Sequence, residues 1–197
     1  MPDREAARVI AEFYLGQAGK CHINGHRAEA QRYRDLGLAL LPPGTETTLS
    51  PELSRRVGEI FYYEDRKDEA LPWLWRAAPA GGSPLLQLAE ILHNKGRYEE
   101  ALPIYRQALT YYPTRVDTRL AAAQAAEATG QLEQARRFLE GMQPLEQLGI
   151  GGLLELAHVC LQLDDVVCAR TQYELVLSLD PTNQQATEGL HQLSSTE

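Results

Sequence analysis

The chain has 197 residues, with 19 Lys and Arg against 27 Asp and Glu, which gives a formal net charge of −8. An acidic chain without a basic stripe and interleaved aromatic residues is not expected to bind the phosphate backbone of a nucleic acid. The sequence also has no apolar run of membrane length and no signal-peptide core, so we expect no membrane span.

The first predicted helix covers residues 3–24. Its apolar residues recur at the spacing of a helix face: Ala6, Val9, Ile10, Phe13 and Tyr14. A first helix pair is predicted over 11–44, and we expect the turns before Ala11 to pack on the exposed end of that pair.

The segment 44–50 is irregular and follows Pro42 and Pro43. Ser50 is predicted to cap the next helix, with Pro51 at its first position. We expect a surface loop over 45–50, and the alternatives are a partner-contacting loop or a bend in the chain.

Four further units follow. Helix pairs are predicted over 51–81, 82–115, 116–149 and 150–183, with a polar capping helix over 184–194. Pro72 and Pro103 each lie early in the second helix of a pair, where the missing N–H costs least. Trp73 and Trp75 cannot share a helix face, so one is expected in the core and the other partly exposed.

Marker residues of these pairs recur at a fixed interval. Ala101, Ala135 and Ala169 are 34 residues apart, as are Gly96 and Gly130. The unit 82–115 shows the pattern most fully, with bulky, small and aromatic residues in a fixed order: Leu85, Leu88, Ala89, Leu92, Ala101, Tyr105, Ala108 and Pro113. The small residues allow two helices to cross closely.

A 34-residue period of helix–turn–helix with this pattern resembles the tetratricopeptide repeat (TPR). The resemblance implies an all-α, right-handed α-solenoid of about five repeats and a capping helix, forming one domain over 1–197. The chain departs from the pattern in two repeats, at Gln17, Arg34 and Gly37 in the first and at Arg119 and Gln147 in the fourth.

The sequence carries no catalytic motif, since it lacks G-x-S-x-G, a Gly-rich phosphate loop and H-E-x-x-H. We therefore expect no enzyme and no cofactor. Cys21 and Cys160 are expected to fill the core, and Cys168 to be partly exposed. We expect neither bound zinc nor a disulfide under reducing conditions. The cysteines form no spaced framework, which favours a reducing, cytoplasmic location.

In TPR arrays, one face of the first helix of each repeat lines a concave groove. Carried onto this chain, that resemblance implies these partner-binding residues: Glu59, Tyr62, Tyr63, Leu86, Glu90, His93, Asn94, Leu120, Gln124, Glu127, Leu154, His158 and Leu161. They form a leucine row beside a mildly acidic row, although core packing is an alternative role for the leucines. The Lys, Arg and Asn of the family's carboxylate clamp are not at these positions.

Three function classes fit the sequence. The first is a protein-interaction scaffold or adaptor whose groove binds a peptide or helix of apolar and basic or neutral character. The second is a structural module that self-associates through a terminal repeat. The third is a regulatory TPR segment of a larger multidomain protein.

Overall fold

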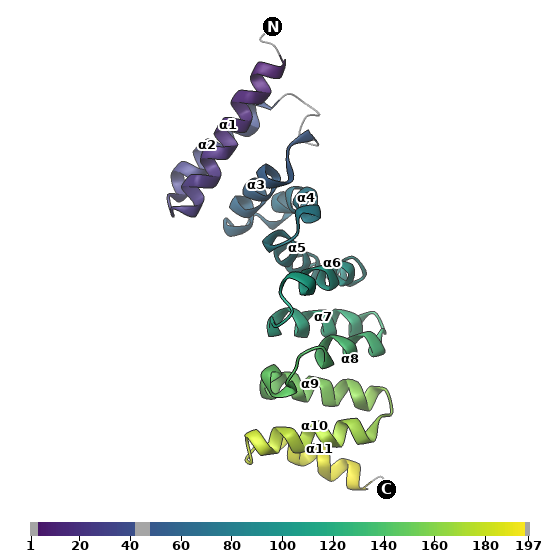
Figure 1. Cartoon of the computed structure of the whole chain (residues 1–197). Coiled ribbons are helices and arrows are strands. Elements are labelled where there is room, and N and C mark those ends of the chain that lie inside the picture. The colour runs from purple at the N-terminus through teal and green to yellow at the C-terminus, as the bar shows by residue number, and fades with distance from the viewer. Residues whose placement is uncertain (1–3, 42–47, 196–197) are drawn as a thin grey trace. The chain divides into compact units, whose positions relative to one another are not determined.

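The computed structural model describes residues 4–41 and 48–195, and within these ranges the regular secondary structure is entirely helical (Figure 1). The helices, in chain order, are α1 (Arg4–Ile23), α2 (Arg27–Leu40), α3 (Pro51–Tyr63), α4 (Lys67–Ala77), α5 (Ser83–Asn94), α6 (Tyr98–Tyr111), α7 (Val116–Ala128), α8 (Leu132–Glu140), α9 (Gly149–Gln162), α10 (Val166–Leu179) and α11 (Gln184–Ser195). Two short 3₁₀ turns, η2 (Ala78–Ala80) and η3 (Leu145–Leu148), precede α5 and α9. The predicted all-α solenoid of helix pairs is confirmed.

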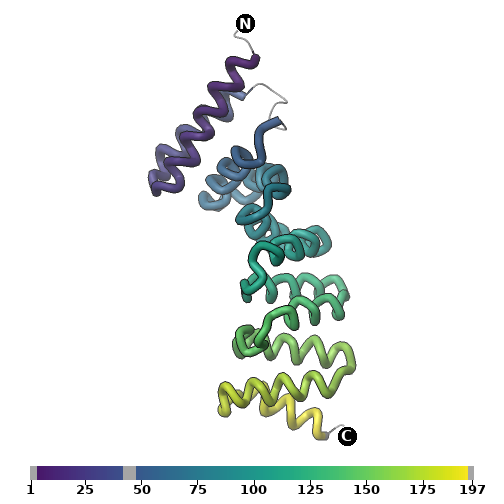
Figure 2. Tube along the Cα trace, viewed as in Figure 1, coloured from purple at the N-terminus to yellow at the C-terminus, as the bar shows by residue number. Residues whose placement is uncertain are grey.

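The chain divides into two compact units, Met1–Ile91 and Leu92–Glu197, with the division inside α5. Figure 2 follows the Cα trace through both units. The repeat limits expected from the sequence, and their union in one domain, stay predictions.

In the first unit, α1 packs along α2, α3 packs along α4, and α1 also contacts α3. Ala11, Leu15 and Ala18 of α1 are fully buried. Gly37 lies where an added Cβ atom would come within 2.8 Å of the Leu15 side chain. The departure from the repeat pattern at Gly37 therefore allows α1 and α2 to approach closely.

The turns of α1 before Ala11 do not pack as expected. Val9 and Ile10 are exposed, with 58% and 48% of their surface accessible, and Ala6 is exposed as well. The prediction that these turns cover the end of the first helix pair is wrong, because α1 is one continuous helix that buries only its opposite face.

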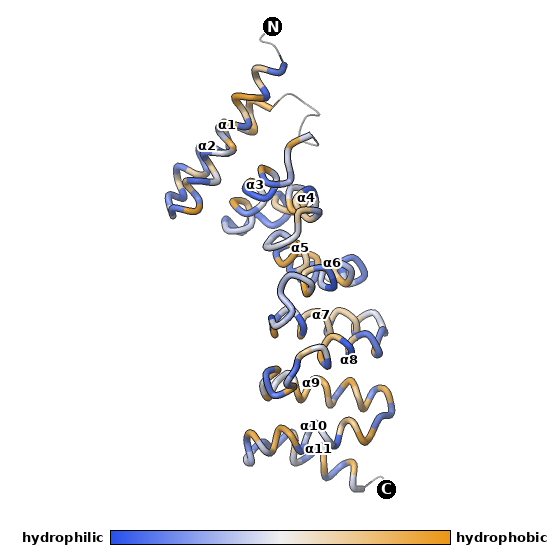
Figure 3. Tube along the Cα trace, viewed as in Figure 1, coloured by the Kyte–Doolittle hydropathy of each residue, from blue (hydrophilic) through white to orange (hydrophobic). Residues whose placement is uncertain are grey.

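In the second unit, α7 packs against α6 and α8, α9 against α10, and α10 against α11. Figure 3 shows α9 as a largely hydrophobic helix, and its Leu153, Leu156 and Ala157 are fully buried. A Cβ atom added to Gly189 would come within 2.5 Å of the Tyr173 ring, so the glycine lets α11 approach α10 closely. The outer residues of α11 are polar, as the predicted capping helix requires.

Local predictions around α3 and α4 are confirmed. The Ser50 side chain accepts a hydrogen bond from the Leu53 N–H at 3.2 Å, and Pro51 begins α3. Trp73 is buried, whereas Trp75 is 38% exposed. Residues 45–47 of the expected loop lie outside the described residues.

Cys160 is buried and Cys168 is half-buried, as predicted, but their pairing was not predicted. Cys160 of α9 and Cys168 of α10 form a disulfide, and Cys21 is free and half-buried. The turn between the two helices brings the Cα atoms of Cys160 and Cys168 to 5.8 Å, which is an ordinary separation for a disulfide. The argument for a reducing compartment from unpaired cysteines therefore does not hold for this pair.

Candidate partner-binding faces

The candidate residues fall on one face in each unit. We call Glu59, Tyr62, Tyr63, Leu86 and Glu90 the α3–α5 face, and Leu120, Gln124, Glu127, Leu154, His158 and Leu161 the α7–α9 face. His93 and Asn94 lie at the C-terminal end of α5, in the second unit.

The acidic residues of the α3–α5 face are already paired. Glu59 accepts hydrogen bonds from Arg55 at 2.8 and 2.9 Å and from the Ser83 hydroxyl at 2.8 Å. Arg55 also donates to Glu52, and this hydrogen bond is the largest of the effects that lower the pKa of Glu52 to about 2. The negative charge of Glu59 is therefore largely balanced within the unit.

Glu90 has a similar environment. It accepts a hydrogen bond from the Tyr62 hydroxyl, and Lys67 Nζ lies 3.4 Å from its Oε1 atom. Tyr63 is 61% exposed, and its ring lies 5.2 Å from the His22 ring of α1. Leu86 is half-buried. This face consequently presents aromatic surface more than free negative charge.

The α7–α9 face is more apolar. Leu120, Leu154 and Leu161 are each half-buried, so each keeps some accessible surface. The Leu120 Cδ2 atom lies 3.4 Å from where a Cβ of Gly152 would stand, so it also helps to pack α7 against α9. The core-packing role considered for the leucines therefore applies to Leu120, and its partner-binding role stays a prediction.

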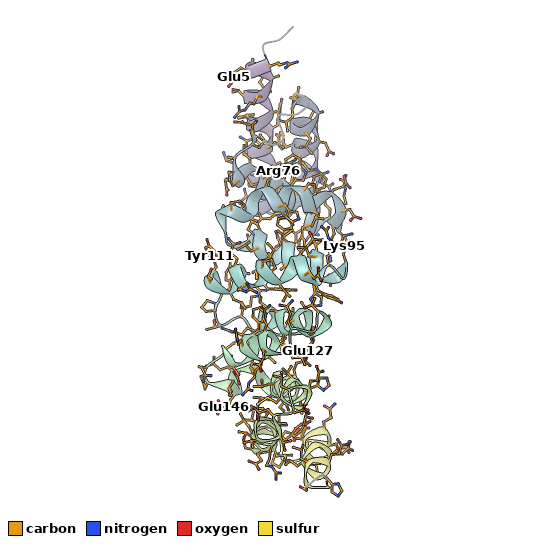
Figure 4. The ribbon with its side chains drawn as sticks, turned by 90° about the vertical axis from the view of Figure 1, so that its right-hand side faces the viewer. Glu5, Arg76, Lys95, Tyr111, Glu127 and Glu146 are labelled. Atoms are coloured by element: carbon orange, nitrogen blue, oxygen red, sulfur yellow. A yellow bond between two sulfur atoms is a disulfide. The ribbon has the colours of Figure 1, made fainter. Side chains whose placement is uncertain are left out.

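Glu127 of α7 is the least compensated acid on these faces (labelled in Figure 4). Its side chain is half-buried, and its Oε1 atom is buried without a hydrogen-bond partner. Burial raises the pKa of Glu127, the nearby Glu155 carboxylate raises it further, and His158 acts in the opposite direction. A cation placed here would satisfy the carboxylate.

Glu155 was not among the sequence candidates. It lies one residue after Leu154 and three before His158, on α9. This helical spacing could have indicated from the sequence that Glu155 lies near His158. Glu155 was missed because it falls outside the repeat positions from which the groove residues were chosen. His158 and Gln162 are exposed and hydrogen-bonded to each other at 2.6 Å, and Gln124 is also exposed.

His93 of the second unit is half-buried and lies beside two aromatic rings. Its ring lies 5.1 Å from the Tyr98 ring and 6.1 Å from the Tyr105 ring, and its Nδ1 atom is buried without a partner. Burial lowers the pKa of His93, and a hydrogen bond with the Ala121 backbone opposes that shift. Asn94 is exposed.

Among the described residues, no group of three or more His, Cys, Asp or Glu side chains is placed to hold a metal ion. None of the helices described is long and apolar enough to cross a membrane. Stacked helix hairpins with two partly exposed faces define an all-α repeat protein of the solenoid class.

Comparison with known proteins identifies the repeat. Residues 92–148 match the family model described as tetratricopeptide repeat. The chain is 42% identical over 84 residues to the human protein O-mannosyl-transferase TMTC1, and 30% identical over 114 residues to the CTR9 homolog of Arabidopsis thaliana. Those regions cover 42% and 57% of this chain but 10% of each relative, so the chain spans about a tenth of their length.

Solved structures share the fold over nearly the whole chain. YrrB, described as a TPR protein with an unusual peptide-binding site, has a TM-score of 0.69 at 14% identity and matches 90% of both chains. MamA from Desulfovibrio magneticus has a TM-score of 0.61 at 18% identity over 93% of this chain and 99% of its own. PilF of Pseudomonas aeruginosa has a TM-score of 0.56 at 19% identity over 98% and 85%. Residues 92–148 therefore match the tetratricopeptide repeat, and the described residues share the fold of these solved structures.

Proposed function

We propose that this chain is a non-enzymatic protein-interaction module whose α7–α9 face binds a partner segment with apolar and basic side chains. The observation that carries the proposal is Glu127, whose half-buried carboxylate has an Oε1 atom without a hydrogen-bond partner. A Lys or Arg of the partner would supply that hydrogen bond as a charge-assisted one.

The leucines supply the apolar part of the proposed interface. Leu120, Leu154 and Leu161 keep accessible surface beside Glu127 and Glu155. Interface energy usually concentrates in a few anchors that become fully buried, so a leucine of this row should contribute more than any exposed charge. The TPR fold is a general scaffold for protein–protein interaction, and the description of YrrB as peptide-binding is in keeping with this role.

The α3–α5 face has a lesser part in this proposal. Glu59 and Glu90 are paired with Arg55 and Lys67, so they attract a basic segment less than Glu127 does. Tyr63, with most of its surface exposed, is the aromatic contact that this face offers.

The test uses two labelled probe peptides, one of alternating Leu and Lys and one of alternating Leu and Glu, with binding followed by fluorescence anisotropy. We expect the Leu/Lys peptide to bind and the Leu/Glu peptide not to bind. Leu120→Glu should abolish binding while the circular dichroism spectrum stays helical. Val167→Glu, at a 76% exposed site on α10, is the matched control and should bind as the wild type does.

Full binding of the Leu/Lys peptide by the Leu120→Glu variant would contradict the proposal. Equal binding of the two peptides would contradict the assigned charge preference.

A further inference from the structure

The outer face of the first helix pair is apolar and uncovered. On α1, Ala6, Val9, Ile10 and Phe13 are spaced i, i+3, i+4 and i+7, and all four are exposed. Such a stripe is the pattern by which a helix packs against another element. α1 is therefore apolar on two opposite faces, of which only the one containing Ala11 and Leu15 is buried. Figure 4 labels Glu5 at the start of this helix.

The face continues onto α2. A groove of about 690 Å³ lies between the two helices, with Phe13, Tyr14 and Gln17 on one side and Arg32, Tyr33 and Leu36 on the other. The rings of Tyr14 and Tyr33 are stacked across it, with centroids 6.1 Å apart. Leu36 and Leu40 are 41% and 39% exposed and extend the apolar surface toward the end of α2.

We propose that this α1–α2 face binds the same face of a second copy of the chain, forming a two-fold symmetric dimer in which α1 of each copy lies over the other's α1–α2 groove. An apolar face requires an apolar counterpart, and half of the large exposed hydrophobic side chains described belong to this helix pair: Val9, Ile10, Phe13, Ile23, Leu36 and Leu40. The remaining six are distributed over α3, α4, α6 and α10, so a second copy offers its best complement at the same place.

The charge distribution favours the same contact. Residues 4–40 contain six basic and four acidic residues, whereas 92–197 contains eight basic and fourteen acidic ones. Two copies repel each other through their net charge of −8. The α1–α2 pair has a net charge of +2 by this count, against −6 for residues 92–197, so a contact through this pair brings less like charge together. Both signs occur at the groove, in Arg32 and Glu29, which suits a two-fold contact.

The size of the face is also sufficient for a dimer. α1 has 20 residues, which gives a length of about 30 Å, and two helices side by side are roughly 20 Å wide. The resulting face of roughly 600 Å² is comparable with the ~800 Å² that each partner buries in a standard protein–protein interface.

The test is the mass of the whole chain in solution, measured by light scattering and by sedimentation over a wide concentration series. The wild type, with a chain mass of 22.0 kDa, is expected to reach twice that mass and no more. Ile10→Asp and Phe13→Asp should remain monomeric at concentrations at least about tenfold above the wild-type midpoint, equivalent to about 1.4 kcal/mol. Val167→Asp, at a more exposed valine of α10, should dimerise as the wild type does.

A cysteine cross-link provides a second test that does not depend on destabilising the face. In a Cys21→Ser background, Ile10→Cys should form a disulfide-linked dimer under mild oxidation, and Val167→Cys should not. A wild type that stays monomeric throughout, a mass that grows beyond the dimer, or a dimer that survives both aspartate substitutions would each overturn the proposal. Adsorption of a monomeric wild type to anionic lipid vesicles would likewise overturn it in favour of a membrane surface. None of these outcomes bears on peptide binding by the α7–α9 face.

Discussion

Arg34 of α2 donates from its Nη1 atom to both carboxylate oxygens of Glu64, the residue after α3, at 2.5 and 2.6 Å. The Arg34 side chain is 2% exposed, and its guanidinium lies 4.3 Å from the centre of the Phe61 ring. This contact holds the first helix pair against the second. Arg34 occupies a position where the repeat pattern has an aromatic residue.

We predict that Arg34→Met destabilises the first unit by ~1–3 kcal/mol, because it removes the closer of two cations from the half-buried Glu64 and leaves only Arg66, at 3.3 Å. The double variant Arg34→Met/Glu64→Met should recover much of that loss, since the poorly paired carboxylate is gone. Urea unfolding measures both. Arg32→Met, an exposed neighbour on α2, is the control and should change little. Equal destabilisation by Arg34→Met and Arg32→Met would show that the ion pair is not important for stability.

The 34-residue period predicted the helix hairpins because the close crossings require small residues at fixed intervals. The period could not predict how the chain compensates where the pattern fails. Arg34 does so through Glu64, and the buried Arg119 does so by donating to the backbone oxygens of Pro113 and Phe138. Such replacements depend on the direction of a long side chain, which the spacing of residues does not determine.

The tolerance for larger side chains should follow the observed burial. Ala101 is fully buried, whereas Ala128 at the end of α7 is exposed. We predict that Ala101→Leu lowers the free energy of unfolding by ~1–3 kcal/mol through overpacking, and that Ala128→Leu has little effect. Denaturant unfolding with unchanged m-values would measure the difference. Equal midpoints for the two variants would mean that Ala101 does not lie at a close helix crossing.

The disulfide gives a third prediction. Cys160 and Cys168 are separated by eight residues, so the bond closes a short loop and should stabilise the second unit by roughly 2 kcal/mol, mainly by restricting the unfolded chain. Denaturant unfolding with and without a reducing agent measures this, and Cys160→Ser should match the reduced wild type. Alkylation of the unfolded, unreduced protein should label Cys21 alone. Labelling of all three cysteines in protein prepared without a reductant would contradict the pairing.

The candidate residues were predictable as positions, but their electrostatic state was not. Glu59, Glu90 and Glu127 have the same acidic character in the sequence. The structure separates them, because Arg55 and Lys67 lie beside the first two and Glu155 lies near the third. That difference depends on neighbours contributed by adjacent turns and helices.

The raised pKa of Glu127 predicts a pH-dependent gain from its neutral analogue. The folded chain binds this proton more tightly than the unfolded chain does, so stability falls as pH rises from about 4.3, the ordinary value of Glu, through the folded pKa. Glu127→Gln should therefore unfold at a higher denaturant concentration than the wild type at neutral pH, and the two should converge below about pH 4. The exposed Glu133→Gln is the control. A Glu127→Gln variant less stable than the wild type at neutral pH would refute the argument.

Charge reversal should distinguish the two faces in binding. Glu127→Lys places a cation where the proposed partner's basic side chain would lie, so we expect the affinity for the Leu/Lys peptide to fall roughly tenfold, or about 1.4 kcal/mol. The salt dependence of binding should change as well. Glu90→Lys reverses a charge that Tyr62 and Lys67 already engage, and we expect a change of less than about threefold. Anisotropy titrations at two salt concentrations measure both variants, and a larger loss from Glu90→Lys than from Glu127→Lys would move the basic partner segment to the α3–α5 face.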